Sequence, residues 1–386
     1  NGDDPVHFNI DENSYHVVVG NRTDETAVLE GFTITAGNAD LILGSQGGGG
    51  MRNEYGSPKL ANLTFSSNST QPSWGGSGGG GMYNADSSPI MNNCDFTGNI
   101  TNESGGGMYN ERSNPRLVDC TFSYNYSEHG GGMHNIDSSP NIDNCVFIGN
   151  AIDGSGGGIY NENSSPRLIE CTFIYNWSDN GGGMSNTYSN PTLRDCKFFG
   201  NLAVSGGGGM RNTRSTSMLT DCIFLENTAT GGGGIGNSSS DTEIISCTFV
   251  DNRVRSRGGG IGNSGSNLTL TNCIIAGNVA GVVDRTWGGG GGLFNSGVSN
   301  LKLTNCIITS NQSTVRGGGF FNEEDSSLIL SNCKISNNIA AIDDVGYSGG
   351  GGIYNTNGES ISLTNCIITG NAVINGSGGV GQTGPP

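Results

Sequence analysis

The sequence predicts an all-β fold, a parallel β-solenoid in which each repeat forms one coil. The first observation is the spacing of the eleven cysteines. The step is 25 or 26 residues from Cys94 to Cys273, and then 33, 27 and 33 residues up to Cys366. A fixed period of this length indicates a repeat architecture, in which one unit buries its apolar face only by stacking on the next.

The second observation is the pattern inside each repeat. Every cysteine is preceded at three residues by a large apolar residue, and followed at two by Phe or Ile and at five by Asn. Cys120–Phe122 alternates inward and outward as a strand does. Turn signals such as Ser165-Pro166 and Asn190-Pro191 separate the segments. No segment has the 3.6-residue period of a helix. Each repeat is therefore expected to form two or three short strands joined by turns.

Stacking of equal coils predicts straight rows of equal side chains. The cysteines are expected to form an inert buried row, because no Cys-x-x-Cys pair is present and stacked Cβ atoms about 4.8 Å apart lie outside the range for a disulfide. The row contains Cys94, Cys120, Cys145, Cys171, Cys196, Cys222, Cys247 and Cys273.

Two rows of asparagine accompany the cysteines. Asn five residues after the cysteine, and a second Asn ten or eleven residues before it, are both expected at corners, where Asn tolerates the left-handed conformation and bonds to the amides above and below. The first of these rows includes Asn99, Asn125, Asn150 and Asn176. The Gly triplets mark places with no room for a Cβ atom or with positive φ.

Motifs such as Phe96-x-x-Asn99 and Phe122-x-x-Asn125, alternating with Gly-Gly-Gly-Met or Gly-Gly-Gly-Ile, resemble the repeats of polymorphic outer-membrane proteins. More broadly, the chain is similar to the right-handed parallel β-helix superfamily that includes pectate lyases. The resemblance implies a right-handed β-helix in a secreted or surface-exposed protein, often an adhesin. We expect a single solenoid of about thirteen coils, with an N-terminal coil or irregular start over 1–44, parallel β-helix repeats over 45–375 and a Gly/Pro tail over 376–386.

Composition is consistent with a solenoid outside the cell. Only 13% of the residues are charged, 33% are hydrophobic and 69 are glycine. The net charge of −17 argues against nucleic acid and anionic membranes as partners. The sequence contains no run of 18 apolar residues, so it predicts no membrane span. The chain begins with Asn1, so we expect a processed or partial product.

Acidic residues directly before the cysteines form the first candidate site. Glu170, Asp195 and Asp221 are expected on consecutive coils about 5 Å apart. Stacked carboxylates repel, so they pair with bases, bind a cation such as Ca²⁺, or take part in catalysis. Arg167 and Arg194 are near enough in sequence to make the first alternative an exposed ion network.

An outward aromatic row is the second candidate. It contains Tyr83, Tyr109, His134 and Tyr160, and serves either as a platform for sugars or as cross-strand packing. Glu128, His129 and His134 together suggest a weaker metal hypothesis. Three insertions at one corner, 69–78, 279–288 and 339–349, are either binding loops or tolerated decoration.

Several Asn-x-Ser/Thr sequences predict glycosylation acceptors, if the source glycosylates. They include Asn21, Asn68, Asn102, Asn163, Asn237 and Asn311.

Three functions compete. The first is a non-enzymatic structural or adhesive solenoid outside the cell, which stacks head to tail through its open β ends. The second is a polysaccharide lyase or hydrolase, and the third is a sugar-binding module. We expect the first, with no cofactor other than Ca²⁺ at the acidic residues.

Overall fold

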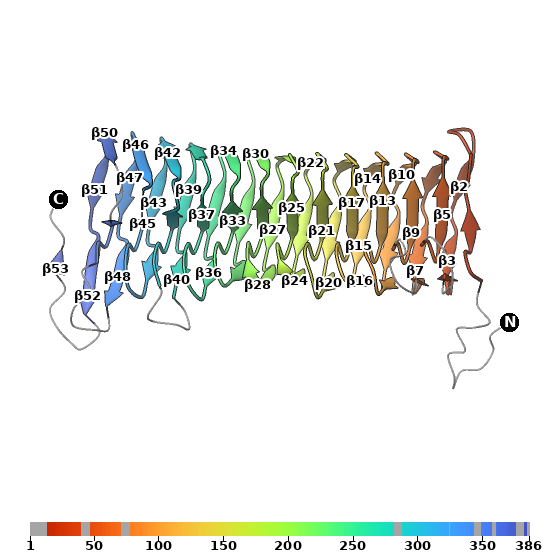
Figure 1. Cartoon of the computed structure of the whole chain (residues 1–386), viewed down its shortest axis with the longest axis horizontal. Helices are drawn as coiled ribbons and strands as arrows, with labels where there is room; N and C mark the ends of the chain where they lie inside the picture. The colour runs from red at the N-terminus through yellow and green to blue at the C-terminus, as the bar shows by residue number, and fades with distance from the viewer. Residues whose placement is uncertain are drawn as a thin grey trace. The chain divides into compact units, whose positions relative to one another are not determined.

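The computed structural model describes residues 14–39, 47–70, 78–281, 288–323, 325–342, 349–356, 360–375 and 382–383. Within these residues every regular element is a β-strand. The chain forms two compact units, Asn1–Pro191 (unit 1) and Thr192–Pro386 (unit 2). In both units the strands form the same four parallel sheets, called A, B, C and D, with one strand of each coil in each sheet (Figure 1). The all-β parallel solenoid is confirmed, with four strands per coil where the sequence predicted two or three.

The strands of unit 1 fall into these sheets as follows. Sheet A contains β1 (Val18–Val19), β5 (Met51–Glu54), β9 (Met82–Ala85), β13 (Met108–Glu111), β17 (Met133–Ile136), β21 (Ile159–Glu162) and β25 (Met184–Thr187). Sheet B contains β2 (Val28–Glu30), β6 (Lys59–Ala61), β10 (Ile90–Asn92), β14 (Arg116–Val118), β18 (Asn141–Asp143) and β22 (Arg167–Ile169). Sheet C contains β3 (Thr33–Thr35), β7 (Thr64–Ser66), β11 (Asp95–Thr97), β15 (Thr121–Ser123), β19 (Val146–Ile148) and β23 (Thr172–Ile174). Sheet D contains β4 (Asn38–Ala39), β8 (Ser69–Thr70), β12 (Ile100–Thr101), β16 (Tyr126–Ser127), β20 (Ala151–Ile152) and β24 (Trp177–Asn180).

Unit 2 repeats the arrangement. Its sheet A contains β29 (Met210–Thr213), β33 (Ile235–Ser238), β37 (Ile261–Ser264), β41 (Leu293–Ser296), β45 (Phe320–Glu323) and β49 (Ile353–Thr356). Sheet B contains β26 (Thr192–Arg194), β30 (Thr216–Thr220), β34 (Asp241–Ile245), β38 (Leu268–Thr271), β42 (Asn300–Thr304), β46 (Ser327–Ser331) and β50 (Ile361–Thr364). Sheet C contains β27 (Lys197–Phe199), β31 (Ile223–Leu225), β35 (Thr248–Val250), β39 (Ile274–Ala276), β43 (Ile307–Thr309), β47 (Lys334–Ser336) and β51 (Ile367–Thr369). Sheet D contains β28 (Leu202–Gly206), β32 (Thr228–Ala229), β36 (Arg253–Val254), β40 (Val279–Ala280), β44 (Gln312–Ser313), β48 (Ile339–Ile342), β52 (Ala372–Asn375) and the antiparallel β53 (Gln382–Thr383).

The first coil lies within the segment 1–44, where a coil or irregular start was expected. Its strands β1 to β4 end at Ala39 and pair with the next coil in the same register as later coils. Ile34, for example, pairs with Phe65. The solenoid therefore begins well before residue 45.

Equal residues lie over equal residues, as the repeat predicts. Met108 pairs with Met133, and Phe122 pairs with Phe147. The buried phenylalanines of unit 1 stack with ring centroids 4.6–4.9 Å apart. This distance equals the separation of neighbouring strands, so each ring lies flat on the ring of the next coil.

The cysteines form buried rows of free thiols, and only Cys366 is half-buried. Each thiol donates to the carbonyl two residues before it, as Cys120 Sγ does to Val118 O at 3.3 Å. Cys145 Sγ in turn accepts the backbone N–H of Cys120 at 3.4 Å. The hydrogen bond with the Cys145 thiol, followed by burial, raises the pKa of Cys120 to about 12, so it stays protonated and unreactive at neutral pH.

The first asparagine row is a fully bonded amide ladder. The Asn125 Oδ1 atom accepts both the backbone N–H and the Nδ2 of Asn99, at 3.0 Å each. The Asn125 Nδ2 group donates to Asn150 Oδ1 at 3.0 Å and to Phe96 O at 2.9 Å. One buried side chain thus makes all four hydrogen bonds that a primary amide can make.

The corner assignment of the second asparagine row is wrong. Asn110 lies inside strand β13, and its side chain is buried and donates to Asn135 Oδ1 at 2.8 Å. Neither row adopts positive φ; the left-handed positions are the neighbours Tyr124 (φ 54°) and Arg112 (φ 47°). The amides are selected for their inward hydrogen bonds, and the turns beside them carry the backbone conformation.

Candidate functional site

The outer face of sheet A in unit 1 carries the aromatic row predicted from the sequence. Tyr83, Tyr109, His134 and Tyr160 lie at equal positions of consecutive strands. Neighbouring rings lie 5.7 Å, 5.1 Å and 4.9 Å apart. The row does not form an open platform, because Tyr83 is only 1% and His134 only 5% exposed. The ring of His129, from the turn between β16 and β17, lies 5.2 Å from Tyr160.

His134 is the unusual member of this row. Neither of its ring nitrogens has a hydrogen-bond partner. Burial, together with the nearby His129, lowers the pKa of His134 to about 3, so the imidazole is neutral at pH 7. His129 uses its Nδ1 atom to accept the backbone N–H of Ser155 at 3.1 Å. In the described part of the chain, no group of three His, Cys, Asp or Glu side chains is arranged to hold a metal ion.

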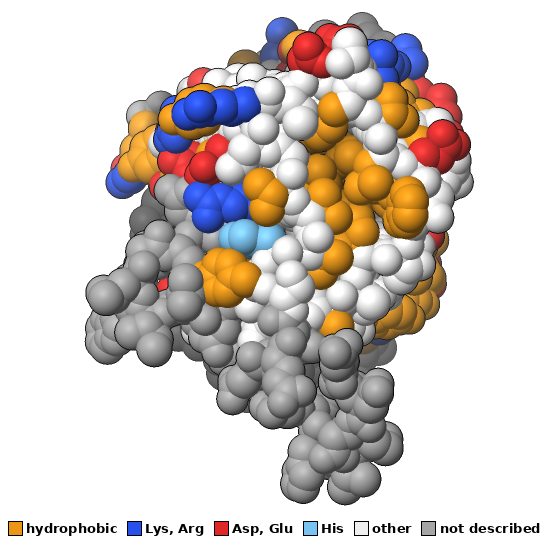
Figure 2. Space-filling view, turned by 90° about the vertical axis from the view of Figure 1, so that its right-hand side faces the viewer, with side chains coloured by type: hydrophobic (Ala, Val, Ile, Leu, Met, Phe, Trp, Pro, Cys, Tyr) orange, Lys and Arg blue, Asp and Glu red, His pale blue; other side chains and the backbone are white. Residues whose placement is uncertain are grey.

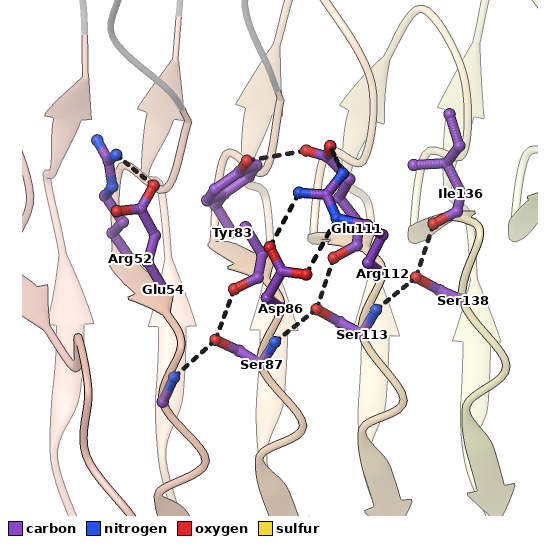
Figure 3. A network of polar contacts seen from close by, with 12 residues as sticks. Arg52, Glu54, Tyr83, Asp86, Ser87, Glu111, Arg112, Ser113, Ile136 and Ser138 are labelled. Atoms are coloured by element: carbon purple, nitrogen blue, oxygen red, sulfur yellow. Dashed lines mark hydrogen bonds and ion pairs between the residues drawn. The ribbon is translucent and has the colours of Figure 1, made fainter.

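An ion-pair network flanks the same face (Figure 3). Arg112 pairs with Asp86 through two hydrogen bonds of 3.0 and 2.9 Å, and with Glu111 through a third. Tyr83 donates its hydroxyl proton to Glu111 at 3.1 Å. The Arg112 guanidinium lowers the pKa of Asp86. Glu111 is thus held in place by a guanidinium and a phenol.

A serine ladder runs along the corner between sheets A and B (Figure 3). Ser87 N donates to Ser113 Oγ and Ser113 N donates to Ser138 Oγ, both at 2.9 Å. Each hydroxyl then donates to the carbonyl two residues before it, as Ser113 does to Glu111 at 2.8 Å. The sequence analysis did not identify these serines, although their spacing of 26 and 25 residues matches that of the asparagines.

The acidic residues before the cysteines occupy turns between sheets B and C. Glu170, Asp195 and Asp221 have φ of 54°, 55° and 54°. Asn and Asp tolerate this left-handed conformation best, which explains why they recur in the row.

The ion pairs around these residues differ from expectation. Arg194 reaches Asp195 at 3.4 Å, whereas Arg167 pairs with Asp143 and not with Glu170. The arginine of each pair is more than half exposed, so both pairs contribute little stability. The geometry supports a turn-forming role for the row, and calcium binding or catalysis there stays a prediction.

The predicted glycosylation acceptors divide into two groups. Asn21, Asn102 and Asn163 are exposed. Asn68, Asn237 and Asn311 are at most 2% exposed, because their amides belong to the ladders. An oligosaccharyltransferase cannot reach the buried three in the folded chain. The insertions at 69–78, 279–288 and 339–349, with Trp74, Trp287 and Tyr347, lie largely outside the described residues.

In unit 2 the outer face of sheet A carries a second aromatic group. Phe294, Phe321 and Tyr354 are register partners, with ring centroids 5.4 and 5.5 Å apart. Arg257 lies 4.9 Å from the Phe294 centroid and pairs with Glu323 at 2.5 Å. In this cluster the Arg257 guanidinium packs between aromatic rings and a carboxylate, and these contacts give the cluster a structural role.

Sequence reasoning missed an aromatic group at the corner between sheets C and D of unit 1, in which the three tyrosines are exposed and the tryptophan is half-buried. It consists of Tyr124, Tyr126, Tyr175 and Trp177, and is called the aromatic corner below. The signal was present as Tyr-Asn-Tyr and Tyr-Asn-Trp around the ladder residues Asn125 and Asn176.

The first coil exposes side chains at positions that are buried in later coils. Phe32 occupies the cysteine position and is 58% exposed, whereas its register neighbour Leu63 is 1% exposed. Figure 2 views this end of unit 1 and shows hydrophobic side chains gathered in its middle. In the last coil of unit 2, Leu363 is 44% exposed above Leu330, which is fully buried.

Comparison with known proteins identifies the fold family. A family model described as a right-handed β-helix region matches residues 6–173 and 150–290. The chain belongs to this family, and the predicted right-handed β-helix is confirmed.

Among solved structures, tailspike protein 3 of bacteriophage CBA120 is similar at 14% identity with a TM-score of 0.38. The alignment covers 88% of this chain and 57% of the tailspike chain, so this chain spans little more than half of that protein. The chain matches none of the curated proteins. The described residues include no helix with the length and apolar character of a membrane span.

Proposed function

We propose that this chain is a non-enzymatic structural and adhesive protein of the cell exterior, in which the β-helix stacks head to tail with copies of itself. The observation that carries the proposal is the exposure of core positions on the first and last described coils. Phe32 and Leu363 are 58% and 44% exposed, whereas the equivalent positions of the neighbouring coils, Leu63 and Leu330, are buried. A second copy is the natural cover, because every coil is already shaped to stack on another coil with the same rows.

The lack of charged side chains among the described residues of the last coil supports a second copy of the chain as the stacking partner. The described residues of the last coil, 349–356 and 360–375, include no Lys, Arg, Asp or Glu. The described residues of this coil therefore place no like charges over one another in a joint, although the chain carries a net charge of −17. Burial of apolar side chains at the joint contributes about 25 cal/mol per Å² of apolar surface removed from water.

Sedimentation velocity combined with negative-stain electron microscopy tests the stacking. The wild-type chain is expected to form rods whose length increases with concentration. Phe32→Asp and Leu363→Asp each place a charge in the joint and should leave monomers. Val298→Asp, at an apolar position that is 76% exposed on a turn, is the matched control and should not change the rods. Wild-type monomers at about millimolar concentration would contradict the proposal.

Glycan hydrolysis is the second candidate, and one arrangement favours it. Glu111 and Glu162 lie at equal positions on β13 and β21, two coils apart. Their backbones are therefore about 10 Å apart, near the upper limit for the two carboxyl groups of an inverting glycosidase. Release of reducing sugar from a set of polysaccharides, lost in Glu162→Gln, would support hydrolysis over the structural role.

A further inference from the structure

The aromatic corner presents tyrosine rings to solvent. Tyr124, Gly149 and Tyr175 are equal positions of three consecutive coils, since the residues before them pair in register. Tyr124 and Tyr175 are 67% and 59% exposed. Both adopt positive φ, of 54° and 50°, where glycine is preferred and the intervening coil has it. A bulky ring at such a position lowers stability relative to glycine, and most of its surface stays in water.

The rings are positioned on the coil between them. A Cβ atom added to Gly149 would lie 2.6 Å from Tyr124 Cε1, so the Tyr124 ring rests directly on that glycine. Tyr126 pairs in register with Ala151, and Ala151 pairs with Trp177. Tyr126 donates its hydroxyl proton to Asp153 at 2.7 Å, which directs its ring across the same coil. Small residues on one coil thus make room for aromatic pairs on the two coils beside it.

The spacing fits an extended ligand that lies along the solenoid. The two aromatic pairs, Tyr124 with Tyr126 and Tyr175 with Trp177, are separated by two coils, or about 10 Å. A sugar chain that crosses from one pair to the other could stack one ring on each, because an aromatic face packs against the apolar C–H face of a sugar. The ladder asparagines between the aromatic residues are buried and take no part in such contacts.

Charge selects among sugars. Glu128 and Asp153 are exposed beside the aromatic pairs, and Asp179 is half-buried on the strand of Trp177. No Lys or Arg lies in 124–128, 149–153 or 175–179. Carboxylates accept hydrogen bonds from sugar hydroxyls but repel uronates and sulfates. We propose that the aromatic corner binds a neutral, linear polysaccharide that runs parallel to the solenoid axis. The proposal rests on the adhesive role proposed above, and not on head-to-tail stacking.

Isothermal titration of the full chain with cellohexaose, xylohexaose and mannohexaose tests the proposal, with hexagalacturonate as the anionic comparison. The wild-type chain is expected to bind at least one neutral hexasaccharide, with an affinity that added salt does not change, and to bind hexagalacturonate less well. The double variant Tyr124→Ala/Tyr175→Ala should lose about tenfold or more in affinity. Both side chains are exposed, so an unchanged melting temperature is expected and shows that the variant is folded.

Tyr55→Ala is the matched control, because Tyr55 is 66% exposed at φ 55° on the corner between sheets A and B. Its affinity for the neutral hexasaccharide should equal that of the wild type. Absence of binding to all three neutral hexasaccharides, tighter binding of hexagalacturonate, or wild-type affinity in the double variant would each overturn the proposal. Phe32→Asp separates the two proposals: glycan binding by this variant as a monomer supports the site independently of stacking.

Discussion

At the scale of single residues, the ladder amides do more than fill corners. Asn125 is fully buried, and its side chain makes hydrogen bonds to Asn99, Asn150 and the carbonyl of Phe96. Every one of these partners is itself buried and finds no water if the amide is removed. The repeat therefore depends on a chain of polar groups whose members satisfy one another, which is costly to interrupt at any one position.

We expect Asn125→Ala to lower the free energy of unfolding by about 3 kcal/mol, because it leaves several buried donors and acceptors unpaired. Asn102→Ala, at an exposed position in the same region, should stay within about 0.5 kcal/mol of the wild type. Urea denaturation followed by circular dichroism measures both. Equal midpoints for the two variants would show that the ladder contributes little.

His134 predicts a pH dependence with a definite sign. Its folded pKa of about 3 lies below the unfolded value near 6.5, so the unfolded chain binds an extra proton between these values. Stability is therefore unaffected by this group above pH 6.5 and decreases as the pH falls toward 3. His134→Phe keeps a ring between Tyr109 and Tyr160 and removes the effect.

Relative to wild type, the variant should gain about 3 kcal/mol of stability between pH 7 and pH 4. Denaturation of both proteins at pH 8, 7, 5 and 4 measures the difference in their free energies of unfolding. The comparison of pH 8 with pH 7 is the control, because position 134 should not change the stability of either protein in that range. A constant difference across the series would mean that His134 does not lose a proton on folding.

At the scale of elements, the Gly triplets set how closely the turns approach the next coil. A Cβ atom on Gly106 would lie 2.6 Å from Gly131 O and 2.7 Å from Tyr126 O, both rigid backbone atoms. Gly98 has φ of 60° with nothing within 4 Å of its Cβ position. The two glycines are therefore required for different reasons, one for space and one for backbone conformation.

We expect Gly106→Ala to destabilise unit 1 by about 3 kcal/mol or more, since the backbone must move apart to admit a methyl group. Gly98→Asn should cost less than about 1 kcal/mol, because Asn tolerates the left-handed conformation and has open space. Thermal unfolding and limited proteolysis distinguish them. A Gly106→Ala protein with wild-type stability would show that the turns are not closely packed.

The elements also show what a sequence can predict here. Strands β14 and β15 follow from Leu117, Cys120 and Phe122, because inward apolar residues alternate around a tight turn. Sheet D was missed, since strands such as β16 (Tyr126–Ser127) are too short to show a pattern. The burial of the aromatic row was missed because the sequence does not show which turn residues lie against it, as His129 lies against Tyr160. The period establishes which residues stack, but not which turns cover them.

At the scale of the whole molecule, the apolar end coils and the net charge of −17 have opposite effects on the association of two copies. Apolar side chains on the end coils favour stacking, whereas the negative charge of two copies opposes their approach. The repulsion is long-ranged, acting over about 30 Å at 0.01 M salt but only about 3 Å at 1 M. The described residues of the last coil include no charged side chain. They therefore contribute no ion pair to the joint that added salt could weaken.

We therefore expect added salt to lengthen the rods, because it screens the repulsion and leaves the apolar joint intact. Sedimentation velocity at 0.01 M and 0.5 M sodium chloride should show the mean particle mass rising several-fold, and Leu363→Asp should remain monomeric at both. A shift to pH 4.4, the calculated isoelectric point, should act in the same direction at low salt. Dissolution of the rods by salt would instead mean that ion pairs hold the joint, and that the exposed core positions of the end coils do not.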